Sequence, residues 1–135
     1  TTPPASTPAS DAATEVVSRT NAARAQHGLP PLTIDGRLVS AAAGHSRDQA
    51  ANSTMSHVGS NGSTLGQRVT ASGYPWRRAA ENVAAGQPTA SAVVAAWLGS
   101  TRHRANMLHS DVVHIGVAVA YSANGTPYWT MVLAA

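Results

Sequence analysis

The spacing of apolar residues changes along this chain, and that change constrains the fold more than any other feature of the sequence. Helical spacing prevails up to about residue 108. From Val113 to Tyr121, apolar residues alternate with small or polar ones, which is the two-residue repeat of a β-strand. Asn124-Gly125 predicts a turn, and residues 127–133 return as a second strand. Helices followed by a hairpin predict an α+β domain with an antiparallel sheet rather than repeated βαβ units.

Apolar stripes with capping residues predict the helices that precede the hairpin. A first helix starts at Ser10 or Asp11 and runs to about Gln26, and a second is capped by Asp35 and ends near Asn52. The Ser-, Gly- and Asn-rich stretch over residues 53–63 predicts a loop. The remaining expectations are a short helix from Thr64 to Gly73, a helix that begins near Thr89 or Ser91, and a broken helical turn over residues 101–108.

Length and composition exclude several classes of protein. With 135 residues the chain suits one domain, and we expect a monomer. The absence of cysteine excludes disulfides, zinc–thiolate sites and thiol nucleophiles. Every apolar stretch is interrupted well before 18 residues, so we expect no integral membrane segment. The net charge is +3 and the nine basic residues, all arginine, are scattered, so we expect no nucleic-acid partner.

The first ten residues, Thr-Thr-Pro-Pro-Ala-Ser-Thr-Pro-Ala-Ser, contain no large apolar side chain. Such a segment cannot bury enough surface to offset its ordering entropy. We therefore expect residues 1–10 to be a disordered tail or linker and residues 11–135 to form the domain. The chain starts at Thr1 without an initiating methionine, which is typical of a mature or trimmed chain. These features favour a secreted or extracytoplasmic protein associated with the cell envelope.

The candidate chemistry rests on histidines and one carboxylate. The signatures of zincins, α/β-hydrolases, P-loop NTPases, dinucleotide-binding folds and EF-hands are all missing. Glu81 is the only acidic residue between Asp48 and Asp111, and two histidines, His57 and His103, lie 24 residues before it and 22 after it. Two imidazoles and a carboxylate suit a divalent ion with open coordination positions. These separations are longer than those within a local metal-binding motif. Structural roles for the three residues therefore stay open, including a pairing of Glu81 with an arginine.

Ordered motifs along the chain are similar to those of the bacterial branch of the CAP superfamily, which includes cysteine-rich secretory proteins, antigen 5 and plant pathogenesis-related proteins. The resemblance covers about residues 12–135. Its motifs are Asn21-Ala-Ala-Arg24, Gly28-Leu-Pro-Pro-Leu32, Asp35-Gly-Arg-Leu38, Gly44-His-Ser-Arg-Asp48, Met55-Ser-His57, Gly73-Tyr74, Glu81-Asn82-Val-Ala84, Trp97-Leu-Gly-Ser100, His103-Arg-Ala-Asn106-Met-Leu108, Ile115-Gly-Val117 and Tyr128-Trp129.

This resemblance implies a three-layer α-β-α sandwich with a small antiparallel sheet and a surface cleft. In many members the cleft is lined by two histidines and two acidic residues, and in some a divalent cation lies between the histidines. Here His57 and His103 match the two histidines, and Glu81 matches the first acidic residue. Ser100 stands where the second acidic residue is expected. The resemblance thus implies a metal site on His57 and His103 for Zn²⁺ or another divalent cation.

Two functions follow from this interpretation. The first is a binding or interaction module whose cleft holds a divalent metal, a lipid, a peptide or a cell-envelope ligand. The second is a metal-assisted, protease-like hydrolase that uses His57, Glu81 and His103, with Glu81 as the candidate catalytic residue. The missing second carboxylate and the lack of a recognisable nucleophile favour the first, so we expect the protein not to be an enzyme.

Overall fold

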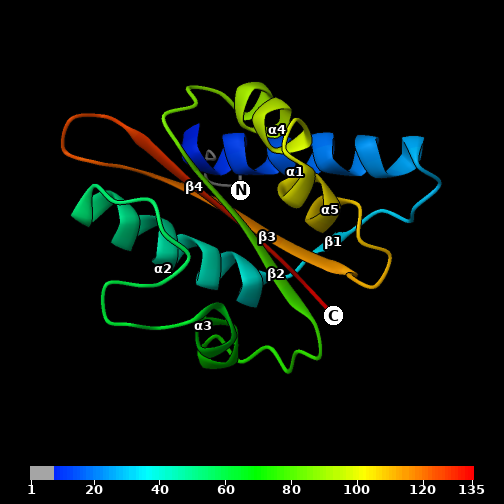
Figure 1. Cartoon of the computed structure of the whole chain (residues 1–135), viewed down its shortest axis with the longest axis horizontal. Coiled ribbons are helices and arrows are strands. Elements are labelled where there is room, and N and C mark those ends of the chain that lie inside the picture. Colours follow the sequence, from blue (N-terminus) through cyan, green and yellow to red (C-terminus); the bar gives the residue numbers. More distant parts are fainter. Residues whose placement is uncertain (1–7) are drawn as a thin grey trace, which may run out of the picture.

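Nine elements follow one another over residues 8–135, the part of the chain that this computed structural model describes. Helices predominate up to residue 107, and a hairpin closes the chain, as the apolar spacing predicts (Figure 1). The elements are α1 (Pro8–Gln26), β1 (Thr33–Ile34), α2 (Gly36–Asn52), α3 (Leu65–Ala71), β2 (Ala79–Ala85), α4 (Ala90–Leu98), α5 (Thr101–Met107), β3 (His114–Tyr121) and β4 (Pro127–Ala134).

The strands form one sheet in the order β1-β3-β4-β2, between two layers of helices. Helices α1, α4 and α5 lie on one face of the sheet, and α2 and α3 lie on the other (Figure 1). This arrangement confirms the predicted α-β-α sandwich. The expected antiparallel pairing holds for β3 with β4 and for β4 with β2, whereas the two-residue β1 pairs parallel to β3.

Strand β4 is the centre of the core, since all eight of its residues are buried. Its side chains alternate between the two faces, as successive residues of a strand must. Trp129, Met131 and Leu133 pack in the cluster that contains residues of α1 and α4. Val132 and Ala134 pack against α2 and α3. Both faces of the sheet are therefore covered, which explains the almost continuously apolar sequence of this strand.

Helix α2 lies directly on the sheet because β3 carries a glycine at the crossing. A Cβ atom on Gly116 would overlap the backbone of Leu38 and Val39. The same face buries a small polar network, in which Ser46 Oγ lies 2.7 Å from Thr130 Oγ1, and Gln49 Nε2 donates to that Thr130 oxygen at 3.1 Å. Buried polar groups need such partners, so this network fixes the register of α2 on the sheet.

The predicted starts of three helices are confirmed by their capping hydrogen bonds. Asp35 accepts from the backbone N–H of Arg37 at the start of α2. Thr64 and Gln67 form a reciprocal capping box at the start of α3, and Thr89 caps α4. The predicted loop over residues 53–63 contains neither helix nor strand. Side-chain caps satisfy backbone donors locally, so these boundaries were readable from the sequence.

Three expectations need correction. Helix α1 begins at Pro8 rather than at Ser10 or Asp11. The tail predicted for residues 1–10 otherwise lies outside the described residues. The strands β1 and β2 were not predicted. Strand β2 has the sequence Ala-Ala-Glu-Asn-Val-Ala-Ala, which lacks apolar alternation, and its extended form comes from pairing with β4.

Within residues 8–135, no helix is both long enough and apolar enough to cross a membrane.

Candidate functional site

The carboxylate of Glu81 lies at the centre of a group of side chains from four parts of the chain. Glu81 is the third residue of β2, and its side chain is only 2% exposed. Arg68 Nη2 donates to Oε2 at 2.6 Å, and His57 Nδ1 lies 3.0 Å from Oε1. Both carboxylate oxygens therefore have a partner. The interpretation that Glu81 pairs with an arginine is confirmed.

Arg68 joins Glu81 to the loop that carries His57. Besides its bond to Glu81, Arg68 Nη1 donates to the backbone carbonyls of His57 at 2.9 Å and Ser63 at 3.1 Å. The Thr64 cap fixes the start of α3, and Arg68 follows one turn later with a side chain that is 12% exposed. Arg68 carries no local signal in the sequence, because its partner lies 13 residues away in another element.

Two side chains of α2 hold the peptide group that precedes His57. Gln49 Oε1 accepts from the N–H of Ser56 at 3.1 Å, and His45 Nε2 lies 2.6 Å from the Ser56 carbonyl. A carbonyl only accepts hydrogen bonds, so His45 carries its proton on Nε2. His45 is buried, as its place on the apolar stripe of α2 predicts, and its Nε2 lies 3.9 Å from Glu81 Oε1. It therefore holds the loop through the Ser56 carbonyl and lies next to the carboxylate.

The contact with Glu81 determines which nitrogen of His57 is free. A carboxylate accepts hydrogen bonds, so Nδ1 of His57 carries the proton and donates to Oε1. In the neutral ring Nε2 then holds the lone pair, on a side chain that is 54% exposed. An exposed imidazole nitrogen with an oriented lone pair is a metal ligand or a hydrogen-bond acceptor.

His103 is a half-buried residue of α5 and is electrostatically coupled to His57. Burial lowers the pKa of His103 below its usual value of 6.5, and the positive charges of His57 and Arg102 lower it further. The ring is therefore neutral at pH 7. Asn82 Nδ2 donates to the His103 carbonyl at 3.1 Å and ties α5 to β2. Asn106 Nδ2 donates in turn to Asn82 Oδ1 at 2.9 Å.

Ser100, at the position where the resemblance implies an acidic residue, is the N-cap residue of α5. Its side chain makes no capping hydrogen bond, and across residues 8–135 it makes no side-chain hydrogen bond to His57, His103 or Glu81. Ser60 is also not placed as a nucleophile beside a histidine, since its Oγ donates to Asp48 Oδ1. In the described chain neither serine is activated by an imidazole.

In the described part of the chain, no group of three or more His, Cys, Asp or Glu side chains is arranged as a metal site. The two oxygens of Glu81 already bind Arg68 and His57. The predicted metal site on His57 and His103 therefore depends on two imidazoles and on positions that a ligand or water would fill.

The comparison with known families agrees with the ordered motifs and with this geometry. The sequence pattern of CAP, the cysteine-rich secretory protein family, matches residues 17–133. The chain belongs to this family. Two relatives from Bacillus subtilis, both uncharacterized, are similar to this CAP domain over most of its length. YkwD is 36% identical over 116 residues, and YlbC, described as a membrane protein, is 34% identical over 118 residues.

The alignments cover 85–86% of this chain but only 34% of YlbC and 44% of YkwD. Among solved structures, an extracellular protein with an SCP domain from Bacillus anthracis superposes with a TM-score of 0.84 and 28% identity, over 98% of this chain and 45% of that one. An outer surface protein of Borrelia burgdorferi gives a TM-score of 0.85 over 92% of both chains, and at 22% identity it supports the fold alone.

Proposed function

We propose that this CAP domain is an extracytoplasmic binding module in which His57 Nε2 and the His103 imidazole hold a divalent cation such as Zn²⁺. The remaining coordination positions would receive a donor atom of a lipid, peptide or cell-envelope ligand. The observation that carries the proposal is the bond between His57 Nδ1 and Glu81, because it places the ring proton on Nδ1 and leaves the lone pair on Nε2 of a side chain that is 54% exposed.

The surroundings of the two histidines suit metal binding. A metal-binding histidine usually donates its other N–H to a carboxylate or carbonyl, which fixes the tautomer and raises the basicity of the ligating nitrogen. Glu81 takes that position toward His57. The lowered pKa of His103 keeps its ring neutral near pH 7, which metal binding requires. Two histidines without a third protein ligand form a weak site, suited to reversible binding.

The state of Glu81 supports binding over hydrolysis. A general base must accept a proton from a bound water, and Glu81 is the candidate for that role. Arg68 and His57 each contact one of its two oxygens. Accepting a proton would weaken both contacts. This arrangement favours Glu81 as the residue that orients His57.

One relative supports an extracytoplasmic location. The Bacillus anthracis protein, which is 28% identical to this chain, is described as extracellular. Since the chain spans less than half of the curated relatives that it matches, we propose that the binding module acts within a longer protein.

Isothermal titration calorimetry of the untagged protein with ZnCl₂ tests the proposal. We expect saturable binding that is lost in the double variant His57→Ala/His103→Ala and retained in His27→Ala, a control at the exposed end of α1. Binding that persists in the double variant would place the metal elsewhere, and no binding by the wild-type protein would overturn the metal proposal. A further variant, Glu81→Gln, should bind zinc more weakly, since it removes the charge that holds His57 Nδ1–H.

A further inference from the structure

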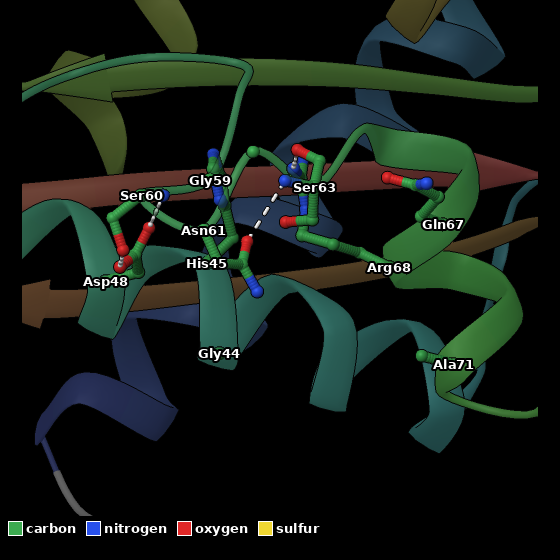
Figure 2. A pocket seen from close by; sticks show the side chains of 11 residues that line it. Gly44, His45, Asp48, Gly59, Ser60, Asn61, Ser63, Gln67, Arg68 and Ala71 are labelled. Atoms are coloured by element: carbon green, nitrogen blue, oxygen red, sulfur yellow. Dashed lines mark hydrogen bonds between the residues drawn. The ribbon is translucent and has the colours of Figure 1, made fainter.

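A polar hollow of about 650 Å³ lies beside the His57–Glu81 site, between α2, the loop over residues 59–63 and α3 (Figure 2). Its volume is within the range of about 300–1,000 Å³ that is usual for small-molecule sites. Arg68 forms part of its wall, whereas His57, Glu81 and His103 do not. The hollow therefore adjoins that site, with which it shares Arg68 and His45, and it has a polar lining of its own.

One wall presents a fixed acceptor, the carboxylate of Asp48. Ser60 holds it twice, through its backbone N–H on Oδ2 at 2.8 Å and through its Oγ on Oδ1 at 2.5 Å (Figure 2). These bonds lower the pKa of Asp48, so the group is ionised at neutral pH. Asn52 Nδ2 also donates to Oδ1, at 3.2 Å. A carboxylate offers about four lone-pair positions, and within residues 8–135 Oδ2 accepts a hydrogen bond from Ser60 alone. Asp48 can thus accept a further hydrogen bond from a ligand.

Two side-chain amides present oriented donors. Asn61 Oδ1 accepts from the N–H of Ser63 at 3.0 Å, and Gln67 Oε1 accepts from the N–H of Thr64 at 2.9 Å. A backbone N–H can only donate, so these contacts identify the oxygen of each amide and assign the NH₂ group to the other side. Among residues 8–135, neither NH₂ group has a hydrogen-bond partner. Both side chains border the hollow.

The charges around the hollow exclude two classes of ligand. Arg68, its one cationic group, is neutralised by Glu81, so an anion would meet the ionised Asp48 without a free positive charge. A metal ion prefers several oxygen ligands, and Asp48, the one carboxylate of the lining, already accepts three hydrogen bonds. What remains is the acceptor Asp48, the two amide donors and the Ser63 hydroxyl, a lining suited to an uncharged ligand that both donates and accepts.

We propose that this hollow binds a neutral saccharide. A hydroxyl or an acetamido N–H of the sugar donates to Asp48, and neighbouring sugar oxygens accept from the side-chain amides of Asn61 and Gln67. Hydroxyls combine donor and acceptor on one atom, which is what this lining requires. Gly44 and Ala71 leave room beside these groups for a sugar ring. The inference does not depend on metal binding at His57.

Proton–nitrogen correlation NMR of the wild-type protein tests this directly, with chitotriose and cellotriose as probes. We expect saturable shifts of the Asn61 and Gln67 side-chain NH₂ signals and of the backbone signals of residues 59–63, with a Kd of about 1 mM, a free energy of about −4 kcal/mol. Chitotriose offers acetamido groups and cellotriose only hydroxyls, so their comparison identifies the donor that Asp48 accepts. No shift with either sugar, or shifts with inorganic phosphate or Ca²⁺ instead, would overturn the proposal.

A matched pair of variants locates the site. Gly44→Gln places a side chain in the hollow and should abolish the shifts, whereas Gly36→Gln, at another glycine of α2, should not. A Cβ at either position meets no atom within 4 Å, so both variants should fold. Gln67→Glu keeps an acceptor for the Thr64 N–H but removes the donor, and should weaken binding about tenfold. Unchanged affinity in Gly44→Gln would show that the sugar binds elsewhere.

Discussion

Arg68 and Glu81 form a nearly buried ion pair, with 2.6 Å between Nη2 and Oε2, in which the same guanidinium also holds the backbone carbonyl of His57. The pair therefore links α3, β2 and the loop with one side chain. The position of His57 depends on this link as well as on Glu81 itself.

Replacing Arg68 by Gln should destabilise the protein strongly. The change leaves Glu81 as a buried charge without its cation, which typically costs about 3–5 kcal/mol. Urea unfolding followed by circular dichroism measures the loss. The double variant Arg68→Met/Glu81→Met removes both charges and should be more stable than Arg68→Gln. A loss below about 1 kcal/mol in Arg68→Gln would show that the pair is as weak as an exposed one.

The ring of His103 should titrate below pH 6.5 in the folded protein, because burial, His57 and Arg102 all disfavour its charged form. The unfolded chain then binds more protons than the folded one as the pH falls below 6.5. The contribution of the neutral His103 ring to the free energy of unfolding should therefore be fully present above pH 6.5. It should decrease as the pH falls below 6.5, until the folded pKa is reached. Proton NMR of the imidazole signals gives the pKa, and both His57→Ala and Arg102→Ala should raise it. An unchanged pKa in both variants would leave burial as its only cause.

Gly116→Ala should be severely destabilising, since the added methyl group would overlap the backbone of Leu38 and Val39 in α2. Backbone atoms cannot move aside as a flexible side chain can, so we expect a loss of more than about 3 kcal/mol or no folding. Gly44→Ala, in the helix α2 that crosses Gly116, is the control, because a Cβ at Gly44 meets no atom of a neighbouring element within 4 Å. That variant should gain about 0.5–1 kcal/mol from helix propensity. Thermal unfolding of both variants and of the wild-type protein measures these changes in stability.

Asp35→Asn should change how the protein responds to acid. Hydrogen bonds from Arg37 lower the pKa of Asp35 to about 2. A lowered carboxyl pKa contributes stability above the unfolded value of about 4, and that contribution is lost as the pH falls through about 2. The variant should therefore lose stability at pH 6 and show a shallower loss between pH 4 and pH 2. Urea unfolding at several pH values measures the slope, and an unchanged slope in Asp35→Asn would show that this carboxyl group does not contribute to the acid response.

Much of the fold was predictable because its determinants are local. The caps at Asp35, Thr64 and Thr89 and the alternation over residues 113–121 depend on neighbours within a few positions. Strand β2 was missed for the opposite reason. Its small and polar residues carry no pattern of their own, and β4, more than 40 residues away, supplies its hydrogen bonds.

The sequence by itself determined the α+β class, most helix boundaries, the hairpin and the choice of His57, Glu81 and His103, the last through ordered motifs rather than through spacing. Only the tertiary structure decided how these residues are used. It brought Arg68 to Glu81 across 13 residues and His57 to Glu81 across 24, and so fixed the partners of the carboxylate and the tautomer of the imidazole. Hydrogen bonds and ion pairs act over a few ångströms in space, and distance along the chain does not reveal them.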